Sequence, residues 1–298
     1  MSGRLLFLPL SSPGVLGARR DAPLPIMTPL YFLHVPKAAG TSWWITLHLL
    51  IPGLDRCASS VCSSHVESTT RFCLHNHSGH APHLARDADW QCAHHRAFRM
   101  VMLRQPLSRI RSAYAHAASM KEKTGCCGMP GGAVVAIRDS ALTLDDYCLR
   151  TPGSANVMAK QLSGVTPGST TSPNATLALR TLRAFEFVGI TEYYDESVAL
   201  LRHTLGLVGE VGMTGAATNA TPAWQVLADS VAVKSNQHNS TKRTGCSSAS
   251  AEALNAIDAR VYREGMRLFA SRFCAVWPTH REICAAKPRR LAEAAAEE

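Results

Sequence analysis

One short segment, residues 31–44, constrains this chain of 298 residues more than any other. An apolar run from Leu30 to Val35 predicts a buried strand, which Pro36 ends. A loop of small residues follows, and Thr41-Ser42 then opens an apolar run typical of a helix. A helix N-terminus offers unpaired N–H groups and a partial positive charge, and small loop residues let a phosphate approach the backbone. The segment therefore predicts an anion cradle whose binding residues are Lys37, Ala38, Ala39, Gly40, Thr41 and Ser42.

The order of residues separates this cradle from the phosphate loop of nucleotide triphosphatases. That loop reads Gly-x-x-x-x-Gly-Lys-Ser/Thr, with the lysine after the glycines and a hydroxyl that binds magnesium. Here Lys37 comes directly after the predicted strand, and no Gly-Lys-Ser/Thr occurs in the chain. A P-loop nucleotide kinase is thus an alternative that lacks its magnesium-binding hydroxyl at the expected place.

A second strand, loop and helix are predicted at residues 99–114. Met100 to Leu103 is a short apolar run, Arg104 stands at its end, and Pro106 suits the first turn of a helix. Arginine suits a phosphate because its planar guanidinium donates two parallel charge-assisted hydrogen bonds. This segment therefore predicts a second anion contact about 60 residues after the first.

Together the two segments resemble the sulfotransferases that use 3′-phosphoadenosine 5′-phosphosulfate. The His-Val-Pro-Lys-x-x-Gly-Thr-Ser form is most similar to the Golgi carbohydrate sulfotransferases, especially the heparan sulfate 2-O-sulfotransferase-like group. In those enzymes the first segment binds the 5′-phosphosulfate. The second, a strand, Arg-Asp-Pro and a helix with a serine eight residues after the arginine, binds the 3′-phosphate. Arg104 and Ser112 match this spacing, whereas Gln105 replaces the usual aspartate, whose carboxylate is expected to support the loop.

The resemblance continues more loosely along the chain. Asn156 to Gly164 is similar to an Asn-x-x-Thr-Arg-x-Leu-x-Gly segment of these enzymes, and Phe185 to Glu192 resembles a later strand. Thr241 and Lys242 lie in a segment that resembles the loop closing over the 3′ end of the nucleotide, which implies that they bind the donor. The predicted helix from Ala249 to Phe273 resembles the C-terminal helix of the family.

The resemblance implies in-line transfer of a sulfonyl group to a hydroxyl of a carbohydrate, which needs a general base and no obligatory metal. Lys37 is the predicted catalytic cation that stabilises the bridging oxygen and the leaving nucleotide. The base is expected in the histidine-rich stretch between the two segments, because the ordinary pKa of histidine lies near neutrality. The 2-O-sulfotransferase-like enzymes place a Gly-His pair there, which makes His80 the first candidate base. His77, one residue further away than the family spacing, is the second. Glu67 is the one glutamate there that could take the base role used by the other branch of the superfamily.

Strand-like and helix-like segments alternate, which predicts an α/β fold: a single P-loop-like domain with a central, mostly parallel sheet flanked by helices. We expect this sulfotransferase domain at residues 29–285. Residues 1–28 are interpreted as a remnant signal or linker, and residues 286–298 as a polar tail. The apolar stretch Leu5–Leu10 is far shorter than the ~20 residues that cross a bilayer, so no membrane anchor is visible. The resembling enzymes are Golgi type II membrane proteins, which implies the Golgi lumen or the secretory pathway.

The charge of the chain narrows its partners. Its 31 Lys and Arg against 22 Asp and Glu give a net charge of +9, which attracts polyanions over a distance. Both the nucleotide and an anionic glycan acceptor are such partners. Nucleic acid is not expected, because no nucleic-acid module is recognised and only 6% of the residues are aromatic. A non-catalytic glycan-binding relative is a further alternative, although it would not need the nucleotide segments. The oligomeric state is left open.

Ten cysteines fit either a lumenal protein with disulfides or a reduced chain with buried thiols. No Cys-x-x-Cys pair occurs, so a zinc ribbon is not expected and no metal site is predicted. Four glycosylation sequons, at Asn76, Asn174, Asn219 and Asn239, are compatible with a secreted glycoprotein.

Overall fold

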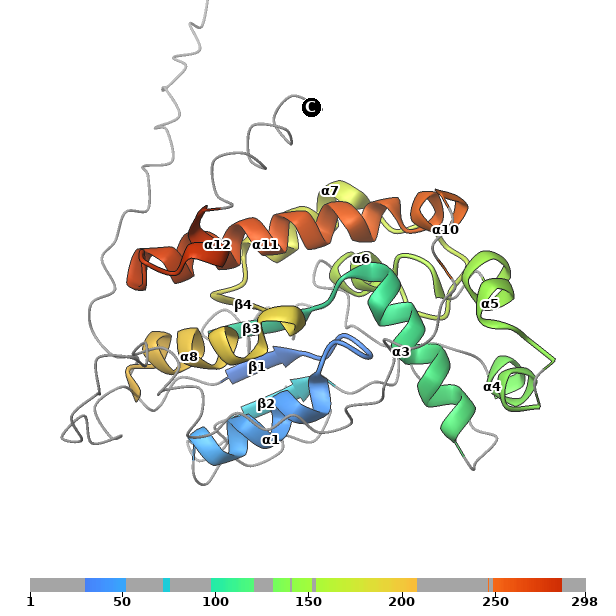
Figure 1. The fold of residues 1–298 in the computed structure, drawn as a ribbon, viewed down its shortest axis with the longest axis horizontal. Helices are drawn as coiled ribbons and strands as arrows, with labels where there is room; N and C mark the ends of the chain where they lie inside the picture. Colours follow the sequence, from blue (N-terminus) through green and yellow to red (C-terminus); the bar gives the residue numbers. More distant parts are fainter. Residues whose placement is uncertain are drawn as a thin grey trace, which may run out of the picture.

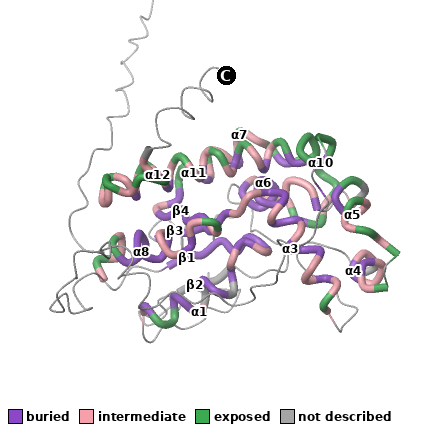
Figure 2. The backbone as a smooth tube through the Cα atoms, viewed as in Figure 1, coloured by how far each residue is buried: buried purple, intermediate pink, exposed green. Residues whose placement is uncertain are grey.

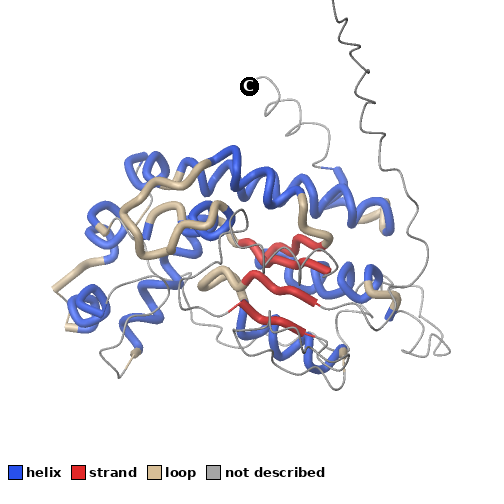
Figure 3. The backbone as a smooth tube through the Cα atoms, turned by 180° about the vertical axis from the view of Figure 1, so that it is seen from behind, coloured by secondary structure: helices blue, strands red, loops and turns tan. Residues whose placement is uncertain are grey.

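The computed structural model describes residues 30–51, 72–75, 98–120, 131–139, 141–151, 154–207, 246 and 249–285. Its centre is a four-stranded sheet in the order β2-β1-β3-β4, in which all neighbouring strands are parallel. The strands are β1 (Leu30–Leu33), β2 (Phe72–His75), β3 (Phe98–Leu103) and β4 (Phe187–Ile190). The predicted α/β fold with a parallel sheet flanked by helices is confirmed (Figures 1 and 3).

Helices surround the sheet along most of the described chain (Figure 1). They are α1 (Gly40–Leu50), α3 (Pro106–Ser119), α4 (Gly131–Arg138), α5 (Leu144–Arg150), α6 (Val157–Leu162), α7 (Ala175–Arg183), the 3₁₀ turn η2 (Thr191–Tyr193), α8 (Tyr194–Thr204), α10 (Ala249–Leu254), α11 (Ala256–Val276) and α12 (Arg281–Ala285).

The alternation of side chains along β4 shows that helices pack on both faces of the sheet. Phe187 stacks on Trp43 of α1, with ring centroids 5.3 Å apart. The next residue, Val188, faces α11, where a Cβ at Gly265 would meet the side chains of Val188 and Leu103. Successive strand residues point to opposite faces, so α1 and α11 cover opposite faces of the sheet.

Strands β1, β3 and β4 are buried on both faces, as a parallel sheet with helices on each side requires. Every residue of β1 and β4 is buried, and β3 is buried except at Arg99, which pairs with Glu186 at 2.7 Å. Figure 2 shows the same division, with buried strands inside and exposed residues on the outer side of α11. The apolar runs that predict strands in the sequence are therefore the core of the domain.

A second hydrophobic cluster lies beside the sheet, between α3, α4, α5 and α10. The sequence patterns described above do not indicate α4 and α5. Five of the eleven buried residues of the cluster come from α3, and the others include Val134 of α4, Tyr147 of α5 and Ala251 of α10. This cluster holds α3, and with it the end of β3, from the side away from the sheet.

The helix expected from Ala249 to Phe273 is broken at Asn255 into α10 and α11, so that prediction is wrong in detail. The Asn255 side chain is buried, and it donates to the Ala251 carbonyl at 2.9 Å and accepts from the Asn156 N–H at 3.1 Å. A polar side chain that bonds the backbone competes with regular helix geometry. The break is therefore fixed by a long-range contact that local sequence does not reveal.

Two disulfides join described residues: Cys148 to Cys246 and Cys274 to Cys284, with Cα atoms 5.8 and 5.7 Å apart. No helix in the described part of the chain has the length and apolar character to cross a membrane. The expected N-terminal segment, residues 1–28, and the tail, residues 286–298, lie outside the described residues.

Candidate anion-binding site

The candidate site lies where the carboxyl ends of three neighbouring strands meet. In the parallel register Leu33 pairs with Val101, and Leu103 pairs with Ile190, so the loops after β1, β3 and β4 leave the same edge of the sheet. The chain places β2 on one side of β1 and β3 on the other. Such a change of direction in an open parallel sheet opens a crevice outside the strand ends, where ligands bind.

The loop after β1 turns sharply into α1. Lys37 and Ala39 have φ values of 65° and 59°, in the left-handed region that non-glycine residues rarely adopt. The first bond of the helix runs from the Trp43 N–H to the Ala39 carbonyl at 2.8 Å. The N–H groups of Gly40, Thr41 and Ser42 precede it, so α1 itself supplies no acceptor for them. Ala39, the N-cap residue, makes no side-chain cap.

Gly40 is required here by a neighbour that the sequence analysis did not consider. A Cβ at this position would overlap the imidazole of His34, which is buried and stacks on Phe32 with ring centroids 5.6 Å apart. The His34 carbonyl in turn accepts a bond of 3.2 Å from the Gln161 Nε2 of α6. Two buried polar residues, His34 and Gln161, therefore pack next to the loop and support its conformation.

Arg104 connects the two predicted anion-binding segments. Its Nη1 donates to the Lys37 carbonyl at 3.1 Å across 67 residues of sequence. Burial lowers the pKa of Arg104, Glu192 opposes this shift, and the positive charge of Arg109 adds to it. Lys37 and Arg104 therefore lie at one place, as the parallel arrangement of their strands predicts.

Gln105 supports the loop at the start of α3, the role expected of the aspartate that the resembling family has at this position. Its Oε1 accepts from the Ser108 N–H at 2.6 Å and so caps the N-terminus of α3, and Pro106 occupies the first turn. The Gln105 N–H donates to Glu192 at 3.0 Å. The loss of a carboxylate at residue 105 therefore leaves the loop supported, by an amide cap on one side and by Glu192 on the other.

Ser112 is buried on α3, two turns after Arg104. Between them lies Arg109, a fully buried residue that the sequence analysis missed. Arg109 Nη2 donates to the Ser154 carbonyl at 2.7 Å, while its Nε and Nη1 have no acceptor among the described residues. Arg109 shares one side of α3 with Ser112, because residues three apart are neighbours on a helix.

A buried carboxylate balances this group of cations. Asp258 of α11 is fully buried and accepts from the N–H groups of Met158 and Ala159, at 3.3 and 2.8 Å, at the start of α6. Burial raises the pKa of Asp258, whereas Arg109, these two bonds and Lys160 lower it. In the opposite direction, the Asn156 Oδ1 accepts from the Asp258 N–H at 3.0 Å. The Asn156–Gly164 segment thus ties α6 to α11 beside the candidate site.

Glu192 links the site to the outer helix layer. One oxygen accepts from the Gln105 N–H, and the other accepts from the Tyr262 hydroxyl of α11 at 3.1 Å. Glu192 is the second residue after β4, so its place near the common edge of the sheet could have been expected from the register of the strands. Its hydrogen-bond partners, Gln105 and Tyr262, could not have been expected from the sequence.

Four predicted site residues, His77, His80, Thr241 and Lys242, lie outside the described residues, as does Glu67. For Thr41 only the backbone is described. Within the described ranges no group of three or more His, Cys, Asp or Glu side chains could hold a metal ion.

Comparison with protein families gives a match over part of the chain. Residues 28–134, 107 of the 298 residues, match the model of the sulfotransferase family. The matched span contains β1, α1, β2, β3 and the whole of α3, and so both loops of the candidate site. No curated protein matches the chain. The match therefore supports sulfonyl transfer as the general class of reaction.

Proposed function

We propose that the protein transfers a sulfonyl group from 3′-phosphoadenosine 5′-phosphosulfate to a hydroxyl of a carbohydrate acceptor. One observation carries the proposal: the 3.1 Å bond from Arg104 Nη1 to the Lys37 carbonyl. It joins two strand-to-helix loops, each of which offers positive charge, at one edge of a parallel sheet. A donor with two separated anionic groups fits two such loops better than a ligand with one.

Each loop suits one end of the donor. The N-terminus of α1 has N–H groups and a positive dipole end, and Lys37 adds a full charge, so it suits the phosphosulfate. Arg104 can meet the 3′-phosphate with a charge-assisted bond, and Ser112 can donate its hydroxyl. Arg109, with two buried donors that have no acceptor in the described ranges, adds positive potential behind both. Thr241 and Lys242 are proposed to contact the nucleotide from their own loop.

The transfer needs no cofactor that changes oxidation state. The acceptor hydroxyl gives its proton to the histidine base, and its oxygen forms a bond to sulfur. The bond from sulfur to the bridging phosphate oxygen breaks, and adenosine 3′,5′-bisphosphate leaves with that electron pair. Lys37 stabilises the charge that develops on the bridging oxygen, a contribution that works best in a site arranged before the reaction.

Two observations support a glycan acceptor and a secretory location. The chain carries a net charge of +9, which favours an anionic substrate. The Cys148–Cys246 and Cys274–Cys284 disulfides are typical of oxidising compartments, such as the secretory pathway. We therefore propose that the protein acts in the Golgi lumen or elsewhere along that pathway.

The decisive experiment measures binding of the full chain to adenosine 3′,5′-bisphosphate and to adenosine 5′-monophosphate by calorimetry. We expect tight binding of the bisphosphate and at least tenfold weaker binding of the monophosphate. Transfer of labelled sulfate from the donor to a panel of polysaccharides then identifies the acceptor. Equal binding of the two nucleotides, or magnesium-dependent binding of a nucleoside triphosphate in their place, would favour the kinase alternative. Glycan binding without nucleotide binding would favour the non-catalytic alternative.

The base has its own test, because His80 and His77 are rival candidates. The His80→Ala variant should lower turnover by roughly 10²–10⁴-fold with little change in donor affinity. Wild-type turnover should fall as the pH drops below about 6.5, since a protonated imidazole cannot accept a proton. Loss of activity in His77→Ala together with normal turnover in His80→Ala would move the role to His77. Normal turnover in both variants would remove the histidine mechanism.

A further inference from the structure

The outer surface of α7 and α11 carries a concentration of arginine that the candidate site does not use. Five arginines on these two helices are exposed: Arg180, Arg183, Arg260, Arg263 and Arg267, here called the arginine ridge. On α11 the spacing i, i+3, i+7 places its three members on one side of the helix. The two helices pack against each other (Figure 1), and Arg183 of α7 and Arg267 of α11 meet at Glu264.

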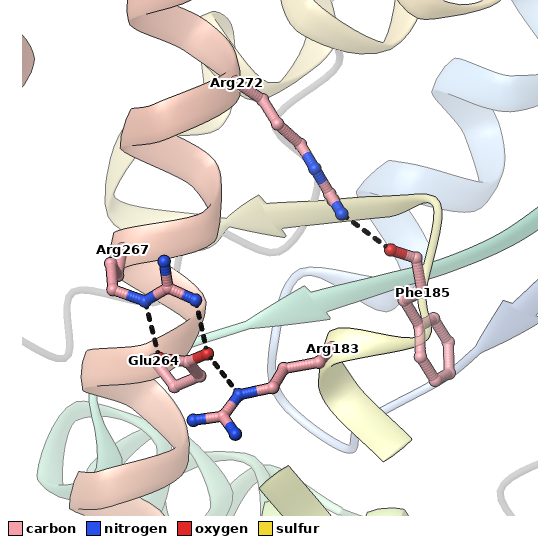
Figure 4. Close-up of polar contacts among 5 residues, drawn as sticks. All are labelled: Arg183, Phe185, Glu264, Arg267 and Arg272. Carbon is pink, nitrogen blue, oxygen red and sulfur yellow. Dashed lines mark hydrogen bonds and ion pairs between the residues drawn. The ribbon is translucent and has the colours of Figure 1, made fainter. Parts of the chain in front are cut away.

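A single shielded carboxylate organises the middle of the ridge (Figure 4). Glu264 accepts from Arg183 Nε at 2.7 Å and from Arg267 Nε and Nη2 at 2.8 and 2.7 Å. The Glu264 side chain is only 11% exposed, whereas those of Arg183 and Arg267 are 56% and 41% exposed. The carboxylate therefore holds two guanidinium groups in place while the positive charges face the solvent.

The ridge is not neutralised by other acidic groups of its helices. In the described α7 and α11 the acidic residues are Glu264 and Asp258, and Asp258 is fully buried. Arg272, by contrast, turns inward and donates to the Phe185 carbonyl at 2.8 Å (Figure 4), so it is not part of the surface. Within α7 and α11, five exposed cations are thus accompanied by one anion outside the core, Glu264, and that anion is largely covered.

The remaining exposed residues of α7 and α11 are alanine, serine and threonine. Single-stranded nucleic acid is bound by basic grooves combined with exposed aromatic rings on which bases stack, and the ridge has none. A membrane-surface helix combines basic residues with large apolar side chains that enter the lipid, and these are also absent from the exposed positions. Small neighbours leave the guanidinium groups accessible to a partner that presents only anionic groups.

We propose that the arginine ridge is a docking surface for an anionic polysaccharide bearing sulfate or carboxylate groups. Guanidinium groups bind such oxyanions in pairs of parallel bonds, and an ordered row of them suits a chain with repeated anionic groups. The choice of a glycan over other polyanions rests in part on the proposed function. The ridge itself is separate from the donor-binding loops, so it holds a longer stretch of polysaccharide than the reacting unit.

The ridge can be tested by heparin-affinity chromatography of the full chain with two matched double variants. Arg260→Gln/Arg263→Gln removes two ridge charges that make no ion pair with Glu264 in the structure. Arg281→Gln/Arg289→Gln removes the same charge from residues outside α7 and α11 and is the control. We expect the ridge variant to elute at clearly lower salt than the wild type, and the control to elute near the wild type. The slope of log Kd against log salt should become shallower by about 1 to 2 in the ridge variant only, by analogy with counterion release from DNA.

Binding of adenosine 3′,5′-bisphosphate distinguishes failure of this proposal from failure of the proposed function. Both double variants should bind the nucleotide as the wild type does, which also shows that they are folded. Equal elution of the ridge and control variants would overturn the proposal, since net charge alone would then explain retention. Ridge-dependent binding of duplex DNA or of phosphatidylserine vesicles that is as tight as binding of heparin would overturn the assignment to a polysaccharide.

Discussion

The two helices that follow β1 and β3 begin in opposite ways. The N-cap residue of α1 is Ala39, which is left-handed and provides no side-chain bond to the helix. The N-cap residue of α3 is Gln105, which is extended and bonds the Ser108 N–H with its own side chain. No side chain of the N-cap residue therefore bonds the first N–H groups of α1, whereas α3 has one N–H group satisfied by its own N-cap residue.

This difference assigns different means of recognition to the two loops. At α1 the backbone and the helix dipole can bind the anion, with Lys37 adding charge. At α3 an anion would instead be bound by the side chains of Arg104 and Ser112. The β1–α1 loop also carries backbone strain at two residues, Lys37 and Ala39. Strained backbone persists only where neighbours enforce it, and His34, Gln161 and Arg104 are those neighbours.

The largest effect is expected at Lys37. The Lys37→Ala variant should lower turnover by roughly 10²–10³-fold, the usual loss when one group that stabilises the developing charge is removed. Lys37→Gly is the matched control for the backbone, because glycine adopts a φ of 65° without strain. It should be as inactive as the alanine variant but more stable in thermal unfolding. Turnover near wild type in either variant would remove this loop from the reaction.

Arg104 and Ser112 should affect affinity more than turnover. We expect Arg104→Ala to weaken binding of the donor by about 1.5–3 kcal/mol, the value of a bond to a charged group. Ser112→Ala should cost about 0.5–1.5 kcal/mol, the value of a neutral bond.

A donor without the 3′-phosphate, adenosine 5′-phosphosulfate, is the control for these two variants. Its Kd should change much less in both. If the two donors lose affinity equally, Arg104 and Ser112 act through the fold of α3 and not through the phosphate, and the two loops are less different than their caps suggest.

Gln105 should matter for stability. Removal of its cap in Gln105→Ala should lower the free energy of unfolding by about 0.5–2 kcal/mol, as measured in urea. Gln105→Asp should restore most of this, since aspartate is a strong N-cap residue. An alanine variant as stable as the wild type would mean that Glu192 alone supports the start of α3.

The smallest effect is expected at Ala39. The Ala39→Gly variant removes a left-handed alanine, worth about 1–2 kcal/mol, but adds freedom to the unfolded chain, worth about 0.4–1 kcal/mol. The net change should be a stabilisation of about 1 kcal/mol or less. Ala38→Gly is the matched control: Ala38 is fully buried and lacks the positive φ, so glycine there should destabilise. Destabilisation by Ala39→Gly equal to that control would show that the loop is not strained.

Sequence alone predicts the parts of this protein that depend on neighbouring residues. The apolar runs before Pro36 and Arg104 are strands, and the small residues after Lys37 form a turn into a helix. Since the strands are parallel, their carboxyl ends share an edge, so the meeting of Lys37 and Arg104 was predictable. The cap at Gln105 could also have been predicted from the sequence. A side chain three residues before Ser108 lies one turn away, close enough to accept from the Ser108 N–H.

Tertiary structure alone decided what depends on distant residues. His34 explains Gly40 through a contact that no pattern of spacing contains, and Gln161 reaches His34 across 127 residues. The electrostatic interaction of the buried Arg109 with the buried Asp258 arises only because α11 packs beside both α3 and α6. The arginine ridge exists because α7 packs on α11, which brings Arg183 and Arg267 to one carboxylate. Local sequence sets strand, turn and helix through short-range sterics and burial, whereas charge pairing between elements depends on how the whole chain packs.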